Sequence, residues 1–263
     1  MLSYKTIEKS KGTDWVVLLH GLGGNSTVFY KQIDEYEKYF NLLLIDFPGH
    51  GDSQSFTREA HTVEKISEEI YSVIDKLSIS AFHLVGFSLG TIIAQQMIAQ
   101  APDRIKSVVL AGAVVRWSWW SQELVKAVYS LRFFAPYMFF YKAFALIMMP
   151  KENHKRSRDI FIREAVKLGR QEFFKWAKLV LKPEYAYNNA VNTQNSIPKL
   201  IVMGEEDHMF IESATEAVSR DPFASIQLIK GAGHVCIIEE AKEFNNLSLL
   251  FLNEQSEAEK VGA

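Results

Sequence analysis

Ser88 is the residue whose surroundings most clearly indicate chemistry. It stands at the centre of Gly86-Phe87-Ser88-Leu89-Gly90, which matches the pattern G-x-S-x-G and lies between a predicted strand and a predicted helix. A turn this tight forces the serine into a strained backbone conformation and leaves no room for a side chain at either glycine. The hydroxyl is thereby held out over the sheet. This context predicts a nucleophile, whereas the pentapeptide alone would also fit a plain Gly-Ser turn.

A serine hydroxyl needs a base to take its proton and a carboxylate to orient that base. Of the seven histidines, His234 follows the last predicted strand in the flexible sequence Gly231-Ala232-Gly233-His234. Asp207 follows the preceding predicted strand in Gly204-Glu205-Glu206-Asp207, with Glu206 as the alternative carboxylate. We therefore expect Ser88, His234 and Asp207 to form a catalytic triad. The alternatives are a surface histidine without a catalytic role and solvated loop carboxylates.

Six short apolar segments supply the strands that must position these residues. They are uniformly apolar, and most end at Gly or Asp, which is typical of strands buried on both faces of a parallel sheet. The segments are 15–19, 41–45, 81–85, 105–110, 199–203 and 225–229. Apolar residues at helical spacing predict helices at 62–77 and 91–100. This alternation predicts an α/β fold with a doubly wound, mostly parallel sheet.

The alternation of strands and helices is interrupted between 114 and 194. This segment is rich in aromatic residues, and from 114 to 193 it has 14 Lys and Arg residues against 6 Asp and Glu residues. We predict an inserted helical cap at 114–194 on a core formed by 1–113 and 195–263. Trp117 and Trp120 are predicted to contact substrate, although packing within the segment would also explain most of its aromatic residues. Its charges would suit a solvated helix face or an anionic group on the substrate.

Composition and charge indicate a folded protein with a small-molecule substrate. Hydrophobic residues make up 48% of the 263 residues and charged residues 23%, which is typical of a globular chain. The net charge of −2 gives no indication of nucleic-acid binding. The most apolar stretch, 133–149, contains Pro136 and Lys142 and is too short to span a membrane.

The N-terminus lacks the basic and apolar regions of a secretory signal, and the single cysteine, Cys236, excludes an intrachain disulfide. We expect a cytoplasmic protein in which Cys236 is a small buried residue rather than a nucleophile. No Cys/His cluster has metal-ligand spacing, and Gly21, Gly23 and Gly24 do not form the dinucleotide pattern G-x-G-x-x-G. We therefore expect no metal and no cofactor. The oligomeric state is left open.

Three further motifs are His20-Gly21-Leu22-Gly23-Gly24, a D-x-P-G-x-G-x-S turn at 46–53, and Pro102-Asp103-Arg104-Ile105. Together with G-x-S-x-G and the chain order Ser, Asp, His, they resemble the α/β-hydrolase superfamily, in its branch with a helical cap. The resemblance implies an α/β-hydrolase fold and an oxyanion hole formed by the backbone N–H groups of Leu22 and Leu89. It also implies that His20 props this loop and that His50 is a turn residue without a catalytic part. Phe87 and Leu22 are expected to border the pocket.

These residues predict a serine hydrolase that cleaves an ester-type bond, in a carboxylester, lactone or thioester, through an acyl-enzyme on Ser88. The substrate is expected to be small and partly apolar. A serine nucleophile argues against the haloalkane dehalogenases and epoxide hydrolases of the superfamily, which use aspartate. One alternative is a menaquinone-pathway lyase that eliminates pyruvate, although Phe87 and Gly90-Thr91-Ile92 depart from its pattern G-Y-S-x-G-G-R. Another is a ligand-binding or signalling protein that keeps the triad with little turnover.

Overall fold

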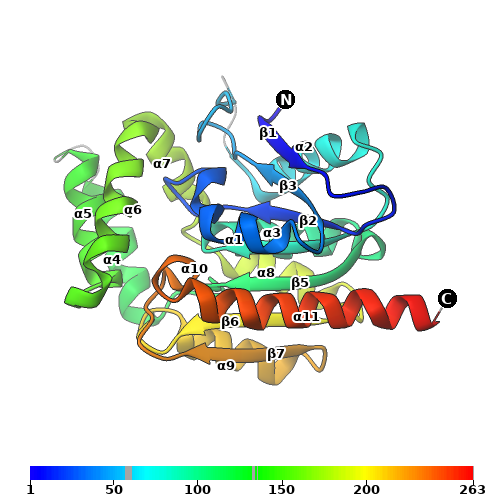
Figure 1. Cartoon of the computed structure of the whole chain (residues 1–263). Coiled ribbons are helices and arrows are strands. Elements are labelled where there is room, and N and C mark those ends of the chain that lie inside the picture. The colour runs from blue at the N-terminus through cyan, green and yellow to red at the C-terminus, as the bar shows by residue number, and fades with distance from the viewer. Residues whose placement is uncertain (57–60, 132–133, 135, 263) are drawn as a thin grey trace.

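The computed structural model describes residues 1–56, 61–131, 134 and 136–262, so Phe133, at the start of the apolar stretch 133–149, lies outside them. Its centre is a seven-stranded sheet in the order β1-β3-β2-β4-β5-β6-β7 (Figure 1). Neighbouring strands are parallel except β1 and β3. The strands are β1 Tyr4–Ile7, β2 Trp15–Leu19, β3 Asn41–Ile45, β4 Phe82–Phe87, β5 Ile105–Ala111, β6 Lys199–Gly204 and β7 Ala224–Ile229. The prediction of a doubly wound, mostly parallel sheet is confirmed.

The central strands are buried, whereas the last strand is not. Every residue of β3, β4 and β6 is buried, as their apolar sequences predict. In β7, Gln227 and Leu228 are exposed, and Leu228 keeps 47% of its accessible surface. The prediction that this segment is buried on both faces is therefore wrong. In the described part of the chain β7 is the last strand of the sheet, so a neighbouring strand screens its side chains from water on one side only.

β1 is an antiparallel edge strand that sequence patterning did not indicate. Its four residues are Tyr-Lys-Thr-Ile, which show neither an apolar run nor a long alternation. Pairing defines the strand, because Tyr4 lies opposite Ile45 and Ile7 opposite Leu42 of β3. A strand this short is set by its neighbour more than by its own composition.

Helices cover both faces of the sheet. α1 packs with α11, which contacts β5, β6 and β7 and lies lengthwise in front of the sheet in Figure 1. On the other face α2 and α8 both pack against α3, which contacts β2, β4 and β5. These helices, with α9 and α10, are α1 Tyr30–Tyr36, α2 Val63–Lys76, α3 Leu89–Gln100, α8 Glu184–Asn192, α9 Ile211–Arg220, α10 Cys236–Glu239 and α11 Ala241–Gly262.

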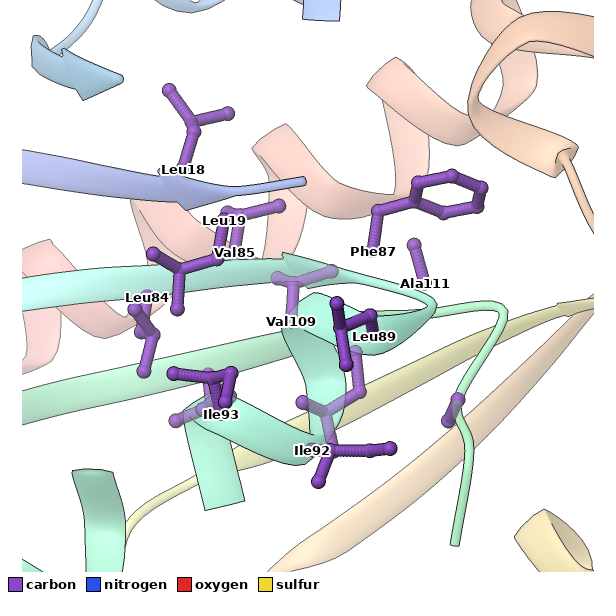
Figure 2. Packing of buried hydrophobic residues seen from close by; sticks show 14 of the residues in the cluster. Leu18, Leu19, Leu84, Val85, Phe87, Leu89, Ile92, Ile93, Val109 and Ala111 are labelled. Carbon is purple, nitrogen blue, oxygen red and sulfur yellow. The ribbon is translucent and has the colours of Figure 1, made fainter. Parts of the chain in front are cut away.

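The packing between α3 and the sheet holds the start of α3 in place. Figure 2 shows Ile92 and Ile93 of α3 next to side chains of β4 and β5, among them Leu84 and Val109. All four side chains are buried. α3 therefore begins directly at the carboxyl end of β4, with its first turn anchored by apolar contacts on the sheet.

Between β5 and β6 the chain forms helices that Figure 1 shows together at one end of the sheet. They are α4 Trp119–Ser130, α5 Tyr137–Met148, α6 Lys155–Leu168 and α7 Arg170–Leu179. Tyr141, Ala165, Leu168 and Phe173 form a small apolar cluster of their own there. α8, by contrast, packs on α3. The division into a core at 1–113 and 195–263 and a cap at 114–194 stays a prediction. Within the described residues, no helix is long and apolar enough to cross a membrane.

Candidate active site

Ser88 forms the turn between β4 and α3. Its φ of 52° and ψ of −115° lie in a region that non-glycine residues rarely adopt. A Cβ on Gly86 would lie 2.6 Å from the Gly90 carbonyl oxygen, and a Cβ on Gly90 would lie 2.1 Å from the Leu19 carbonyl oxygen. The two glycines are therefore required by backbone contacts. The Ser88 N–H donates to the Ala111 carbonyl at 2.9 Å, which ties the strained residue to the end of β5.

Ser88, His234 and Asp207 lie in one hydrogen-bonded line. His234 Nε2 is 2.8 Å from Ser88 Oγ, and His234 Nδ1 is 2.7 Å from Asp207 Oδ2. His234 and Asp207 are buried, while Ser88 stays partly exposed. Because a carboxylate only accepts, Nδ1 carries the proton of a neutral ring and Nε2 accepts the serine hydroxyl. This arrangement prepares Ser88 Oγ for attack on an electrophile.

The loops after β6 and β7 bring the carboxylate to the imidazole. A Cβ on Gly204 would lie 2.2 Å from the Gly233 carbonyl oxygen, so a glycine is needed where these two loops cross. The His234 ring packs near two aromatic side chains, with Phe87 at 5.8 Å and Phe210 at 5.3 Å between ring centroids. Phe210 was not recognised from the sequence, although it lies three residues after Asp207.

Glu206, the alternative carboxylate, lies away from the imidazole of His234. Its carboxylate is 2.9 Å from Lys151 Nζ and accepts a hydrogen bond from Asn153 at 3.2 Å. The hydrogen bond from Lys151 is the main reason that the pKa of Glu206 is lowered. The structure thus brings Asp207, the carboxylate that the sequence favoured, and not Glu206 to His234.

The loop at 20–24 is held by histidines in neutral form. His20 Nδ1 is 2.8 Å from the Gly21 carbonyl oxygen, and its Nε2 accepts the Phe47 N–H at 2.9 Å. Burial lowers the pKa of His20 to about 4, so near pH 7 this ring can accept at one nitrogen and donate at the other. His50 Nε2 accepts the Gly23 N–H at 3.0 Å. Burial also lowers the pKa of His50 well below its usual range.

The two expected oxyanion-hole donors are one loop N–H, of Leu22, and one helix N–H, of Leu89. In a trans peptide the N–H and C=O groups point in opposite directions, so fixing the Gly21 carbonyl on His20 also fixes the direction of the Leu22 N–H. Leu89 is the first residue of α3, and the first N–H groups of a helix have no acceptor within it. His50 sits in the expected turn and, in addition, contacts the loop through Gly23.

Two cavities lie beside this site, lined by neighbours of the triad and not by Ser88, Asp207 or His234 themselves. The larger, of about 1000 Å³, is lined by Leu22 and Phe87 from the sheet side and by residues 152–164 from the start of α6 and the 3-10 helix before it. The smaller, of about 80 Å³, is lined by Leu22 and Trp117 together with apolar side chains of α4, α5 and α7. Trp120 borders neither, and its ring lies parallel to that of His208. Leu22, Phe87 and Trp117 thus line cavities, and their contact with substrate stays a prediction.

Charged side chains that line the larger cavity belong to the helical segment whose charges the sequence assigned to a solvated helix face or to an anionic group on the substrate. Lys155 pairs with Asp159 at 2.6 Å, and Arg163 pairs with Glu164 at 3.1 Å. Arg156 also lines this cavity. Among the described residues, no group of three or more His, Cys, Asp or Glu side chains is arranged to hold a metal ion.

The chain is similar in sequence to known proteins. A dihydrolipoyllysine-residue acetyltransferase component of the acetoin cleaving system of Cupriavidus necator is 27% identical over 91% of this chain, which spans 63% of that protein's length. A 2-hydroxy-6-oxononadienedioate/2-hydroxy-6-oxononatrienedioate hydrolase of Escherichia coli is 26% identical, and the match covers 92% of this chain and 88% of that protein.

The fold is shared with solved structures at low sequence identity. An esterase from Exiguobacterium antarcticum is 19% identical and superposes with a TM-score of 0.83, covering 96% of this chain and 95% of that one. The family model described as alpha/beta hydrolase fold matches residues 14–241. Because this match spans most of the chain, the protein belongs to the alpha/beta hydrolase fold family.

Proposed function

We propose that the protein is a serine hydrolase that cleaves an ester-type bond, in a carboxylester, lactone or thioester, through an acyl-enzyme on Ser88. The observation that carries this proposal is the continuous line from Ser88 Oγ to His234 Nε2 at 2.8 Å and from His234 Nδ1 to Asp207 at 2.7 Å. The relatives named as a hydrolase and an esterase support a hydrolytic reaction. The substrate is a small, partly apolar molecule.

In the first half of the reaction, Ser88 Oγ attacks the carbonyl carbon while His234 Nε2 takes the serine proton. The carbonyl oxygen becomes an oxyanion, which accepts hydrogen bonds from the backbone N–H groups of Leu22 and Leu89. Each such donor contributes roughly 2.7–4 kcal/mol to transition-state stabilisation in well-studied enzymes. His234 then gives its proton to the departing alkoxide or thiolate, and the acyl group stays on Ser88.

In the second half, water attacks the acyl carbon and His234 takes a proton from it. Collapse of the second oxyanion breaks the bond to Ser88 Oγ, which recovers its proton from His234. The acid product leaves. Asp207 stays ionised throughout and stabilises the imidazolium that forms in each half.

The two cavities suit a substrate with an apolar part and a polar part. A volume of about 1000 Å³ is at the upper end of small-molecule sites, so the larger cavity can hold a substrate well beyond the size of an acetate ester. The charged side chains that line the larger cavity suit a polar group, and the smaller, apolar cavity suits an alkyl or aryl group. We propose that the segment 114–194 acts as a cap that sets this choice.

Labelling with a serine-directed fluorophosphonate tests the proposal. The native protein should gain one adduct, on Ser88, and Ser88→Ala should gain none. Turnover of p-nitrophenyl esters should fall in Ser88→Ala by up to the order of 10⁶ seen when a triad serine is removed from a well-studied protease. Ser219→Ala is a matched control, since Ser219 is exposed and its hydroxyl donates to the Glu216 carbonyl. A label elsewhere, or turnover kept in Ser88→Ala, would refute the assignment.

A further inference from the structure

Tyr141 of α5 reaches from the helical segment to the loop that carries Leu22. Its hydroxyl donates to the Leu22 carbonyl oxygen at 3.2 Å, across 119 positions of sequence. Gly23, the next residue, has a φ of +76°, and a Cβ there would lie 2.7 Å from the Tyr141 hydroxyl oxygen. A side chain at position 23 would therefore collide with the Tyr141 hydroxyl, and the glycine leaves room for it.

The peptide between Leu22 and Gly23 is held at both ends. Its carbonyl accepts from Tyr141 at 3.2 Å, and its N–H donates to His50 Nε2 at 3.0 Å. A peptide unit is planar and rigid, so two hydrogen bonds on opposite ends fix its orientation. Tyr141 belongs to α5, while His50 belongs to the turn after β3. The Leu22–Gly23 peptide is thus held both by the helical segment, through Tyr141, and by the core, through His50.

Leu22 lies between two fixed peptides. The peptide before it is oriented by His20, through the Gly21 carbonyl, and the peptide after it by Tyr141 and His50. The backbone dihedral angles of Leu22 are the links between these planes. Without the Tyr141 hydrogen bond, the second peptide is held by His50 and the first by His20, so the dihedral angles of Leu22 and the direction of its N–H are less tightly held.

The Tyr141 side chain is itself firmly packed. Its ring stacks on Phe161 of α6 at 4.7 Å between centroids and meets Phe173 of α7 edge-on at 5.7 Å. The side chain is 1% exposed. Burial raises the pKa of Tyr141 well above its usual range. The hydroxyl therefore keeps its proton and remains a donor near neutral pH. The position of the hydroxyl therefore follows the position of α5, α6 and α7.

We propose that Tyr141 is a positioning residue that holds the Leu22–Gly23 peptide and thereby keeps the Leu22 N–H aimed at the oxyanion. It makes oxyanion stabilisation depend on the helices between β5 and β6 being packed on the loop. The hydroxyl bonds the carbonyl of Leu22 and not the reacting atoms, so it acts through Leu22. This inference rests on the proposed hydrolase function for its catalytic consequence, but not for its effect on the loop.

Tyr141→Phe removes the hydroxyl and keeps the ring. We expect kcat for p-nitrophenyl esters to fall about 10-fold with little change in KM, since the loss of one neutral hydrogen bond is of this size and acts on the transition state. Affinity for a trifluoromethyl ketone, which forms a tetrahedral adduct on the serine, should fall by a similar factor. A residue that only packs the segment would not produce this split.

Tyr137→Phe is the matched control on the same helix. The Tyr137 hydroxyl also donates to a backbone carbonyl at 3.2 Å, that of Val166, but within the helical segment. The same chemical change there should leave kcat, KM and ketone affinity within about twofold of the native protein.

Hydrogen exchange of the Gly23 amide, which donates to His50, provides a readout independent of catalysis. In the native protein without substrate this amide should exchange slowly, and Tyr141→Phe should speed its exchange several-fold, while Tyr137→Phe should not. Faster exchange in a protein that hydrolyses no ester would keep the positioning role and reject the hydrolase function. Unchanged exchange, or unchanged kcat and ketone affinity in an active Tyr141→Phe enzyme, would overturn the inference.

Discussion

Glu172 links α7 to the segment after β3, and its charge should stabilise the folded protein. The carboxylate accepts hydrogen bonds from His61 and, at 2.6 Å, from Ser55 Oγ, and it lies 3.3 Å from Lys175 Nζ. Only 7% of the residue is exposed. A Cβ on Gly49, which has a φ of +72°, would lie 2.4 Å from the Glu172 side chain, so the turn packs directly on the carboxylate.

The size of this stabilisation follows from the pKa. Burial by itself would raise the pKa of Glu172, but the hydrogen bonds from His61 and Ser55 and the charge of Lys175 outweigh it and hold the pKa at about 2, against 4.5 ordinarily. That difference corresponds to about 3 kcal/mol. Because the folded pKa is lowered, the stabilisation is complete above pH 4.5 and is lost as the pH falls toward 2.

Urea unfolding of the native protein and of Glu172→Gln measures this contribution. The glutamine keeps the shape of the side chain but does not titrate, so the difference in unfolding free energy isolates the carboxylate. We expect the native protein to lose about 3 kcal/mol relative to the variant between pH 7 and pH 2, with more than half lost by pH 3. Glu152→Gln, on an exposed residue of the same segment, controls for the substitution itself. A difference that stays constant across this pH range would refute the reasoning.

Two further substitutions test the site and the turn that carries it. Asp207→Asn should preserve the fold and lower kcat for p-nitrophenyl esters by roughly 10⁴, because the amide favours the wrong tautomer of the imidazole, as in a well-studied protease; Glu206→Gln should retain near-native turnover, and the reverse pattern would move the role to Glu206. Gly90→Ala should lower the free energy of unfolding by about 1–3 kcal/mol or more and abolish fluorophosphonate labelling, because its Cβ would lie 2.1 Å from the Leu19 carbonyl oxygen. Gly24→Ala, whose Cβ would lie 3.5 Å from its nearest neighbour, is the stability control, and equal losses in both variants would contradict the steric argument.

Most of the sheet could be predicted because its central strands carry their own signal. A strand that is buried on both faces, such as Asn41–Ile45, must be apolar at nearly every position that neighbouring layers cover, so its burial can be predicted from its sequence. Edge strands carry a weaker signal. Tyr4–Ile7 was missed and the burial of Ala224–Ile229 was misjudged, because the environment of an edge strand depends on what lies beside it and not on its own composition.

The candidate site divides in the same way. Ser88 could be assigned from the sequence because the elbow is a local structure, in which the requirement for Gly86 and Gly90 arises within a few residues and is visible as a motif. The sequence favoured Asp207 for the third position but had no local feature that excluded Glu206. Adjacent loop residues point in different directions, and only the crossing of the loops after β6 and β7 shows which carboxylate meets His234.

The amino-acid sequence by itself determined the α/β architecture, the elbow serine and the order of the three site residues, because local patterning and tight turns encode these features. The tertiary structure alone decided the contacts of Tyr141 with Leu22 and of Glu172 with Ser55 and His61. These pairs are more than 100 positions apart in the chain. The sequence around a tyrosine or a glutamate on an amphipathic helix does not indicate its hydrogen-bond partner, because the packing of the helices on the sheet determines which residue lies beside it.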